Sequence, residues 1–417
     1  MKVAIADPSR AAGLRCLEHF SAAAGVRYSK ARNFDFGPER RGNVSMLSPF
    51  LRHRLVLEQE VIEAVLLQHS LAGASKFIQE IFWRAYFKGW LEHRPTVWED
   101  YRDRLWDLLR SLDDDASLLE RYDRAVEGKT GIECFDTWVS ELVTTGYLHN
   151  HARMWFASIW VYTLGLPWQL GADFFLRYLI DGDPASNTLS WRWVCGLHTT
   201  GKTYLARPSN IARFTDNRFN PVEQLASSAP PLVDERVHPV RSLPVADVFG
   251  PDERFGLLVT EEDGYPESLL GDQPPVAVLG AIATQMRSPL PIGDGARRFA
   301  AAAVSDAVTR TARRYRVDGE LSETSDWGSL LIDWAGRQQV RTIVTPYVPV
   351  GPVCDLLDDA RAALERDGIR LLRPRRPYDS AAWPHARRGY FKMKEKIPAI
   401  LEQLGIRAGN HETAQSA

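Results

Sequence analysis

The stretch 145–193, which begins with TGYLHNHARMWFAS and ends with DGDPASNTLSWRW, decides the fold of the first half of this chain. It concentrates Asn, His, Arg, Asp and Trp residues in segments whose apolar residues have helical spacing. Asn150 and Met154 are four residues apart and therefore share one face of a predicted helix. Polar residues at such spacing come together on one surface, although a loop or a helix cap can be this polar for structural reasons alone.

A second helix is expected to start at Pro184. Asp183 precedes this proline, and a capping carboxylate before a first-turn proline is typical of a helix start. Asp181 and Asp183 then lie at a helix N-terminus, where backbone N–H groups gather. Asn187 and Trp191 follow on one face of the same helix.

Tryptophan is unevenly distributed along the chain. Of its 13 tryptophans, all but three lie between Trp83 and Trp193. Core packing is the ordinary role of any single tryptophan. The cluster as a whole favours a flat aromatic ligand, a base-stacking surface or an electron path.

Length and charge describe an ordinary protein of two domains. The chain has 417 residues, 45% of them hydrophobic, and a formal net charge of −2. Because the chain is not basic overall, any binding of nucleic acid must depend on a local patch.

The cysteines and the N-terminus indicate a cytoplasmic protein. The 4 cysteines are scattered without CxxC spacing, so we expect neither a disulfide framework nor a metal site, and a reducing compartment fits. The N-terminal residues MKVAIADPSRAAGLRCLEHF lack the apolar core of a signal peptide, and no apolar run approaches the length of a membrane span.

Two earlier segments carry further candidate site residues. Ser45 and Ser48 flank Leu47 in a turn-rich segment, and could offer hydroxyls and backbone N–H groups to a phosphate at a helix start, or could act as ordinary caps. In the helical pattern from 56 to 90, Glu80 and Trp83 share one face.

Basic residues exceed acidic ones by four between 184 and 220. This segment includes Arg192 and Lys202 and contains Trp191 and Trp193. It could bind phosphates and stacked bases together, or it could be a solvated face.

The pattern of apolar residues changes after a linker-like segment, SSAPPLVDERVHPVRSLP. Apolar runs that predict strands then alternate with helical patterns, which is typical of a parallel α/β domain. We therefore expect a helical domain at 1–225, a linker at 226–245 and a smaller Rossmann-like α/β domain at 246–417. No GxGxxG follows any of the strands, so a dinucleotide is not indicated in the second domain.

Four blocks in the first half share their pattern with one family: VSMLSPFL at 44–51, EIFWRAYF at 80–87, TGYLHNHARM at 145–154 and DGDPASN followed by WRW at 181–193. They resemble the blocks TSxLSPYL, ELIWREFY, TGxxHNRxRM and DGDxAxN…WxW in the FAD-binding helical domain of the photolyase/cryptochrome family. Tyr28 and the residues RNF at 32–34 match the lead-in to the first block.

The resemblance implies an FAD cofactor and assigns its contacts. Tyr28, Ser45, Leu47 and Ser48 would hold the phosphates and the ribityl chain. Arg153 and Asp181 would pair beside the isoalloxazine ring.

In the same family, Asp183 corresponds to the acceptor for ring N3, and Asn187 to the residue that faces N5. Asn150 also lies in this cofactor-binding set. Trp191 and Trp168 match the first two members of the family's electron-transfer chain.

The resemblance also implies a substrate. In the family's cyclobutane-dimer enzymes a flipped pyrimidine dimer lies between two tryptophans, here Trp83 and Trp193, and extrusion is cheap because the dimer pairs weakly. Glu80, Asn150 and Met154 would touch the dimer, and Glu80 could stabilise its radical anion by hydrogen bonding or proton donation. Relatives that repair six-four photoproducts carry histidines where this chain has Asn150 and Met154.

This chain departs from the family at three places. Val44 replaces a threonine, and the third tryptophan of the electron chain is missing, which leaves Trp155, Trp160 or Trp106 as its substitute. The α/β antenna domain, which precedes the flavin domain in the family, resembles the C-terminal segment here. We expect no antenna chromophore to bind there.

These features predict a monomeric, light-driven lyase that splits cyclobutane pyrimidine dimers in UV-damaged DNA, with Arg84, Arg192 and Lys202 contacting the DNA. The first alternative is a cryptochrome-like blue-light photoreceptor that binds FAD without repair. The second is a flavoprotein with a structural or DNA-binding role. Repair is favoured by the presence of every expected dimer contact, because signalling alone does not require them. These contacts are Glu80, Trp83, Asn150, Met154 and Trp193.

Overall fold

Apolar residues at helical spacing dominate the first half of the chain, and this half is helical. The structure is a computed structural model in which residues 7–234 and 236–407 are described. The helices of this half are α1 (Arg10–Ser21), α2 (Val26–Ala31), α3 (Ser48–Arg52), α4 (Glu58–Leu66), α5 (Ser75–Glu92), α6 (Thr96–Asp114), α7 (Ala116–Val126), α8 (Glu133–Thr145), α9 (Asn150–Ser158), a π-helical turn η1 (Ile159–Thr163), α10 (Trp168–Tyr178), α11 (Pro184–Val194) and α12 (Pro208–Phe214).

The clustered tryptophans mostly form the core of this helical half. Several of them are fully buried: Trp98, Trp138, Trp155, Trp160 and Trp191. Helix α8 ends at Gly146, whose φ of 68° is left-handed and where a Cβ atom would lie 2.8 Å from Ile180. This glycine lets the chain turn closely against the segment that leads to α11.

The second half contains the expected parallel sheet. Its strands β1 (Gly256–Thr260), β2 (Ala277–Ala281), β3 (Asp318–Ser322), β4 (Thr342–Val344) and β5 (Arg370–Leu372) form one 5-stranded sheet in the order β3-β2-β1-β4-β5, with every pairing parallel. Two short helices, α13 (Glu267–Leu270) and η2 (Thr284–Arg287), follow β1 and β2.

Helices cover both faces of the sheet. Leu257 and Val259 share a core with α14 (Asp294–Tyr315), and Leu258 shares another with α15 (Trp327–Gln338) and α16 (Pro352–Arg366). Strands covered on both faces need continuous apolar runs, which is why β1 and β2 could be predicted. Together these elements confirm the expected fold class, a helical region followed by a parallel α/β sheet.

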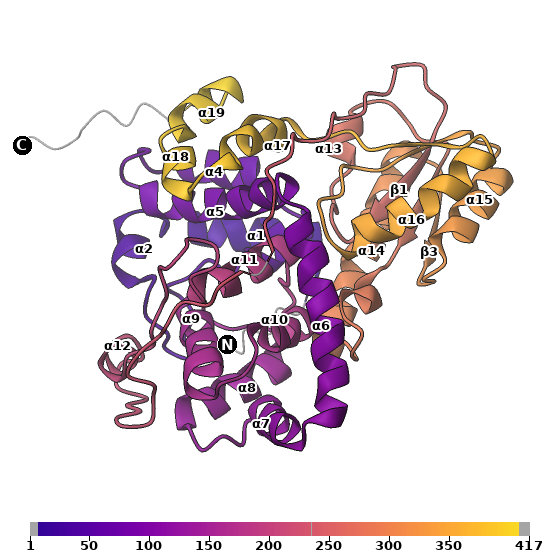
Figure 1. The fold of residues 1–417 in the computed structure, drawn as a ribbon. Coiled ribbons are helices and arrows are strands. Elements are labelled where there is room, and N and C mark those ends of the chain that lie inside the picture. Colours follow the sequence, from indigo (N-terminus) through magenta and orange to yellow (C-terminus); the bar gives the residue numbers. More distant parts are fainter. Residues whose placement is uncertain (1–6, 235, 408–417) are drawn as a thin grey trace, which may run out of the picture.

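The last helices return to the helical half. Helices α17 (Pro377–Ala382), η3 (Trp383–Arg387), α18 (Tyr390–Lys394) and α19 (Ile397–Gln403) lie over α4 and α5 in Figure 1. Trp383 and Met393 belong to the core of the helical half. At Gly89 on α5 a Cβ atom would lie 2.9 Å from Trp383, so the two segments are in close contact. The last described helices of the segment expected to form the α/β domain therefore pack against the helical half.

Buried ion pairs tie the end of α3 to the segment after β1 and to α17. Arg52 Nη2 lies 2.7 Å from Glu262 Oε1, just beyond β1. Arg54 Nη2 donates to both carboxylate oxygens of Asp379 at 2.7 Å. All four side chains are buried, so each charge depends on its partner.

No helix among the described residues is both long and apolar enough to cross a membrane.

We expect Asp379→Asn to lower the free energy of unfolding by about 3–5 kcal/mol, because it removes the two-oxygen partner of a buried guanidinium. Urea unfolding followed by circular dichroism measures the change. The matched control is Asp107→Asn, which removes the exposed partner of Arg110 and should cost about 1 kcal/mol or less. A loss for Asp379→Asn no larger than that of the control would contradict the interpretation.

Candidate functional site

The N-terminus of α11 is built as the sequence predicts. Asp183 Oδ1 accepts from the backbone N–H of Ser186 at 2.7 Å and caps the helix. Its Oδ2 lies 3.1 Å from Arg84 Nη2 and 3.6 Å from Lys88 Nζ, both on α5. Burial alone would raise the pKa of Asp183, but Arg84, Lys88 and Arg52 outweigh it and hold that pKa well below its usual range. This carboxylate therefore stays charged.

The second acid of the turn pairs with α9. Arg153 Nη2 donates to Asp181 Oδ2 at 2.8 Å, and Arg153 Nε donates to the carbonyl of Leu148 at 2.9 Å. Asp181 Oδ1 is buried and has no hydrogen-bond partner among the described residues. The structure thus leaves one carboxylate oxygen at this point as an open acceptor.

Asn187 lies one turn into α11 and is buried. Its Nδ2 donates to the carbonyl of Ala172 at 2.7 Å, while Oδ1 makes no hydrogen bond to any described residue. The bond to Ala172 fixes the orientation of the amide, so that the oxygen is the free end.

The end of α3 lies next to the Asp181–Asp183 turn. Arg52, the last residue of α3, donates from Nε to the carbonyl of Gly182 at 2.8 Å. Ser45 Oγ accepts from the backbone N–H of Leu47 at 3.3 Å, and Leu47 is buried. Ser48 is the first residue of α3. Arg52, which directly follows the first of the four sequence blocks, thus contacts the last of them.

Tyr28 lies on α2 beside the aromatic core. Its ring packs edge-on against Phe77 at 5.1 Å and against Phe20 at 6.0 Å. Burial raises the pKa of the Tyr28 hydroxyl, which therefore stays protonated and able to donate.

Glu80 and Trp83 share one face of α5, as predicted, and each has a neighbour that the sequence did not indicate. Glu80 Oε1 accepts from Arg32 Nη1 at 2.6 Å. Burial raises the pKa of Glu80, although Arg32 acts in the opposite direction. The ring of Trp83 stacks on Tyr390 from α18, with centroids 3.6 Å apart and planes inclined by 12°.

Tyr390 is held in place by its hydroxyl, which donates to the carbonyl of Gln79 at 2.7 Å. Sequence reasoning missed it, because its helix lies more than 300 residues after Trp83 in the chain and no local pattern encodes such a contact. The segment GYFKMK has an aromatic pair that could have marked it as a candidate.

The other three expected contacts of a flipped dimer lie on α9 and α11. Asn150 is exposed and is the first residue of α9, and Met154 is half-buried one turn later. Trp193 stacks on Tyr204 with centroids 5.6 Å apart. Trp83 and Trp193 thus have different aromatic partners, Tyr390 and Tyr204.

The two tryptophans expected to carry electrons have separate aromatic neighbours. Trp191 packs edge-on against Trp160, with centroids 6.2 Å apart, and Trp168 stacks on Tyr101 at 5.8 Å. Of the three substitutes for the missing third tryptophan, Trp160 is therefore in contact with Trp191. Trp106 is exposed on α6.

Two of the three expected DNA contacts lie in internal ion pairs. Arg192 is only 3% exposed and donates from Nη1 to Asp234 Oδ1 at 3.1 Å. Arg84 is bound to Asp183, and Lys202 is exposed. Because Arg84 and Arg192 already pair with carboxylates and lie mostly inside the protein, these positions do not favour their predicted contacts with DNA phosphates.

His149 caps α9 as a neutral side chain. Its Nδ1 accepts from the backbone N–H of His151 at 3.1 Å, and its Nε2 is buried without a partner among the described residues. Burial lowers the pKa of His149 to about 4. Among the described residues, no three His, Cys, Asp or Glu side chains are grouped so that they could hold a metal ion.

Acid should destabilise the protein through His149. The unfolded chain takes up a proton near pH 6.5 and the folded chain only near pH 4, so this stabilisation is present above pH 6.5 and is lost as the pH falls between these values. The loss is on the order of 3 kcal/mol at pH 4. His149→Asn, which keeps an acceptor for the cap, should therefore flatten the decline of unfolding free energy measured in urea between pH 7 and pH 4.5. The exposed control His19→Asn should leave the decline unchanged, and an equal slope in both variants would refute the assignment.

Comparisons with known proteins agree on this half of the chain. Residues 77–232 match the family model described as the FAD binding domain of DNA photolyase. The deoxyribodipyrimidine photo-lyase of Streptomyces griseus is 36% identical over 181 residues, which are 43% of this chain and 35% of that protein. The deoxyribodipyrimidine photo-lyase of Thermus thermophilus is 32% identical over 198 residues, which are 48% of this chain and 45% of that protein. This chain thus spans less than half the length of these relatives.

Two solved structures are also similar in part. A class III photolyase from Agrobacterium tumefaciens is 28% identical, with a TM-score of 0.39, covering 50% of this chain and 43% of its own. A cryptochrome from Synechocystis sp. PCC6803 is 22% identical, with a TM-score of 0.42, covering 50% of this chain and 43% of its own. Residues 77–232, within the helical half, thus form a region of the FAD-binding type found in the photolyase/cryptochrome family.

Proposed function

We propose that this protein is a light-driven DNA repair flavoprotein that splits cyclobutane pyrimidine dimers. The observation that carries the proposal is the Arg153–Asp181 ion pair beside Asp183 and Asn187, inside a region that matches the FAD binding domain of DNA photolyase. The curated relatives that bear the name deoxyribodipyrimidine photo-lyase support it.

The residues at this place fit a flavin. A flavin ring offers N–H donors, and both Asp181 Oδ1 and Asn187 Oδ1 are acceptors without a protein partner among the described residues. In the proposed assignment, Asp181, Asp183 and Asn187 face the ring. Tyr28, Ser45, Leu47 and Ser48 would hold the remainder of the cofactor.

When bound in its reduced form, FAD supplies the light-driven electron that the splitting of a dimer requires. The chain's own residues bind and orient the damaged bases. Trp83 and Trp193 would provide aromatic surface, while Asn150 and Met154 would contact the polar edge and the body of the dimer. Glu80, whose pKa is raised by burial although Arg32 opposes that shift, would face a pyrimidine carbonyl and donate a hydrogen bond to it when protonated.

A blue-light photoreceptor that binds FAD without repair is the second candidate, and one contact favours it. Tyr390 stacks on Trp83 at 3.6 Å, so one face of that ring is already covered. A base could stack on the same face only after Tyr390 moves.

The deciding experiment is illumination with blue light of the reduced, FAD-loaded protein mixed with oligothymidine that contains dimers. Light-dependent loss of dimers supports repair. Flavin absorption and photoreduction without loss of dimers would support the photoreceptor instead. A protein that cannot be loaded with FAD would refute both.

Glu80→Gln should slow dimer splitting by roughly 10- to 100-fold. The hydrogen bond from Glu80 to the charged dimer radical, worth about 1.5–3 kcal/mol, is then replaced by a weaker bond from a neutral amide. The rate is measured from dimer loss under saturating light at equal FAD content. Glu120→Gln, on the exposed face of α7, is the control and should repair at the rate of the unaltered protein. Equal rates in all three proteins would remove Glu80 from the proposed mechanism.

Asp181→Asn should weaken FAD binding by roughly 10- to 100-fold, because it removes the charge that pairs with Arg153 and orients the open oxygen. Flavin fluorescence during titration of the apoprotein gives the dissociation constant. Asp100→Asn removes another buried carboxylate, on α6 and paired with Arg104 and Arg236, and should leave FAD affinity unaltered. If both variants lose affinity equally, the effect is one of stability and not of the site.

A further inference from the structure

The C-terminal segment that returns to the helical half is strongly basic. Residues 384–396 read PHARRGYFKMKEK, with Glu395 as the one acidic residue in this segment. Its cationic side chains are Arg387, Arg388, Lys392, Lys394 and Lys396.

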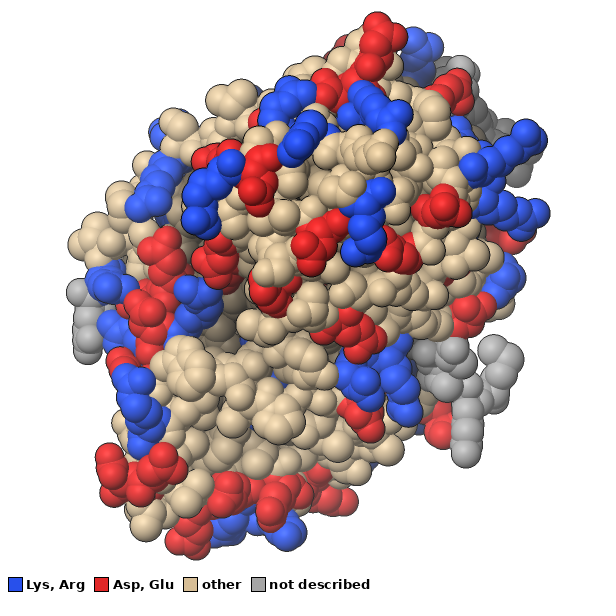
Figure 2. Space-filling view, turned by 90° about the vertical axis from the view of Figure 1, so that its right-hand side faces the viewer, with Lys and Arg blue, Asp and Glu red and all other residues tan. Residues whose placement is uncertain are grey.

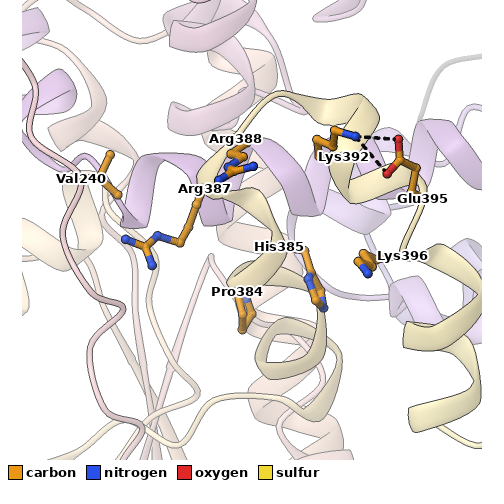
Figure 3. A pocket seen from close by; sticks show the side chains of 8 residues that line it. All are labelled: Val240, Pro384, His385, Arg387, Arg388, Lys392, Glu395 and Lys396. Atoms are coloured by element: carbon orange, nitrogen blue, oxygen red, sulfur yellow. Dashed lines mark hydrogen bonds and ion pairs between the residues drawn. The ribbon is translucent and has the colours of Figure 1, made fainter.

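These side chains surround a surface hollow of about 610 Å³. It is lined by Val240, Pro384, His385, Arg387, Arg388, Lys392, Glu395 and Lys396. Figure 3 shows that Lys392 is bonded to Glu395, whereas Arg387 extends toward Val240 across the hollow. Among the described residues, Arg387, Arg388 and Lys396 form no ion pair, and both arginines are exposed.

Burial lowers the pKa of His385, which therefore adds no charge at neutral pH. The positive charge of the hollow thus comes from exposed arginine and lysine side chains. Such groups, spread over η3, α18 and α19 and not converging on one point, suit an extended polyanion better than a single small anion.

The hollow adjoins the helix that carries Trp83. Tyr390, between Arg388 and Lys392 in the sequence, stacks on Trp83. Phe391 is 73% exposed next to it. Cations that follow a backbone and aromatic rings that stack with bases are the two components of single-strand nucleic-acid surfaces.

The two arginines expected to contact DNA do not offer the same combination. Arg84 and Arg192 are held in internal ion pairs, as described above. On the face drawn in Figure 2, most blue side chains lie among red ones.

We propose that the surface 384–396 binds the backbone phosphates of the nucleic acid that the Trp83 site receives. This inference rests on the proposed function, because it takes DNA as the partner. It assigns the DNA contact to the C-terminal segment and not to the segment 184–220.

The test compares two double variants with the same loss of charge. Arg387→Ala/Arg388→Ala alters the proposed surface, and Arg361→Ala/Arg366→Ala removes two exposed arginines from α16 on the α/β half. Fluorescence anisotropy of a labelled oligothymidine, repeated from 50 to 200 mM salt, gives the affinity and its salt dependence. Circular dichroism and FAD content verify that each variant is folded.

Loss of two phosphate contacts should reduce the slope of log K against log salt by about 1.4 for a single strand and about 1.8 for a duplex. The α16 variant should keep the slope of the unaltered protein. An unchanged slope in Arg387→Ala/Arg388→Ala, or an equal reduction in both variants, overturns the assignment. Millimolar ADP could displace the oligonucleotide from the unaltered protein but not from Arg387→Ala/Arg388→Ala. That result would assign the hollow to a mononucleotide and would also overturn the proposal.

The outcomes separate this inference from the proposed function. If the unaltered protein repairs dimers while Arg387→Ala/Arg388→Ala binds oligothymidine with an unchanged slope, only the surface assignment fails. If the unaltered protein binds no oligonucleotide at all, both proposals fail.

Discussion

The structure depends on a group of buried ion pairs between the end of β1 and the end of α3. Glu262 and Asp263 follow β1. Arg52 is the last residue of α3, and Arg54 lies two residues later. A buried charge without a partner costs several kcal/mol, so removing either side of this interface would leave unpaired charges on the other. These ion pairs therefore hold the segment after β1, and with it the α/β half, against the end of α3.

The same ion pairs reach the candidate flavin site. Arg52 bonds to the carbonyl of Gly182, and Lys88 lies 3.8 Å from Glu262 and 3.6 Å from Asp183. In open α/β sheets the carboxyl ends of the strands, where the strand order reverses, form the usual ligand crevice. Here that reversal lies between β1 and β4, and Arg52 occupies the end of β1. The α/β half thus supports the turn that carries Asp181 and Asp183.

Local chemistry explains which parts of this arrangement could be predicted. The cap at Asp183 and the buried strands β1 and β2 follow from short-range rules, because a capping carboxylate and a continuous apolar run are visible in sequence. Strand β3 was missed since it is an exposed edge strand with the sequence DGELS. Charged residues were the least predictable: Arg192 looks like a surface cation, but Asp234 lies 42 residues later and buries it. Stacking of Tyr390 on Trp83 likewise depends on tertiary packing.

The cover over Trp83 is weak enough to be compatible with binding of a base. An aromatic stack contributes about 0.5–1.5 kcal/mol beyond area burial, and the Tyr390 hydroxyl bond to Gln79 adds about 0.5–1.5 kcal/mol. Base stacking on an aromatic ring returns about 1–3 kcal/mol. Tyr390 is itself buried in the same core as Met393, so it would also lose apolar burial if a base replaced it. Contacts to the backbone phosphates would have to supply that difference.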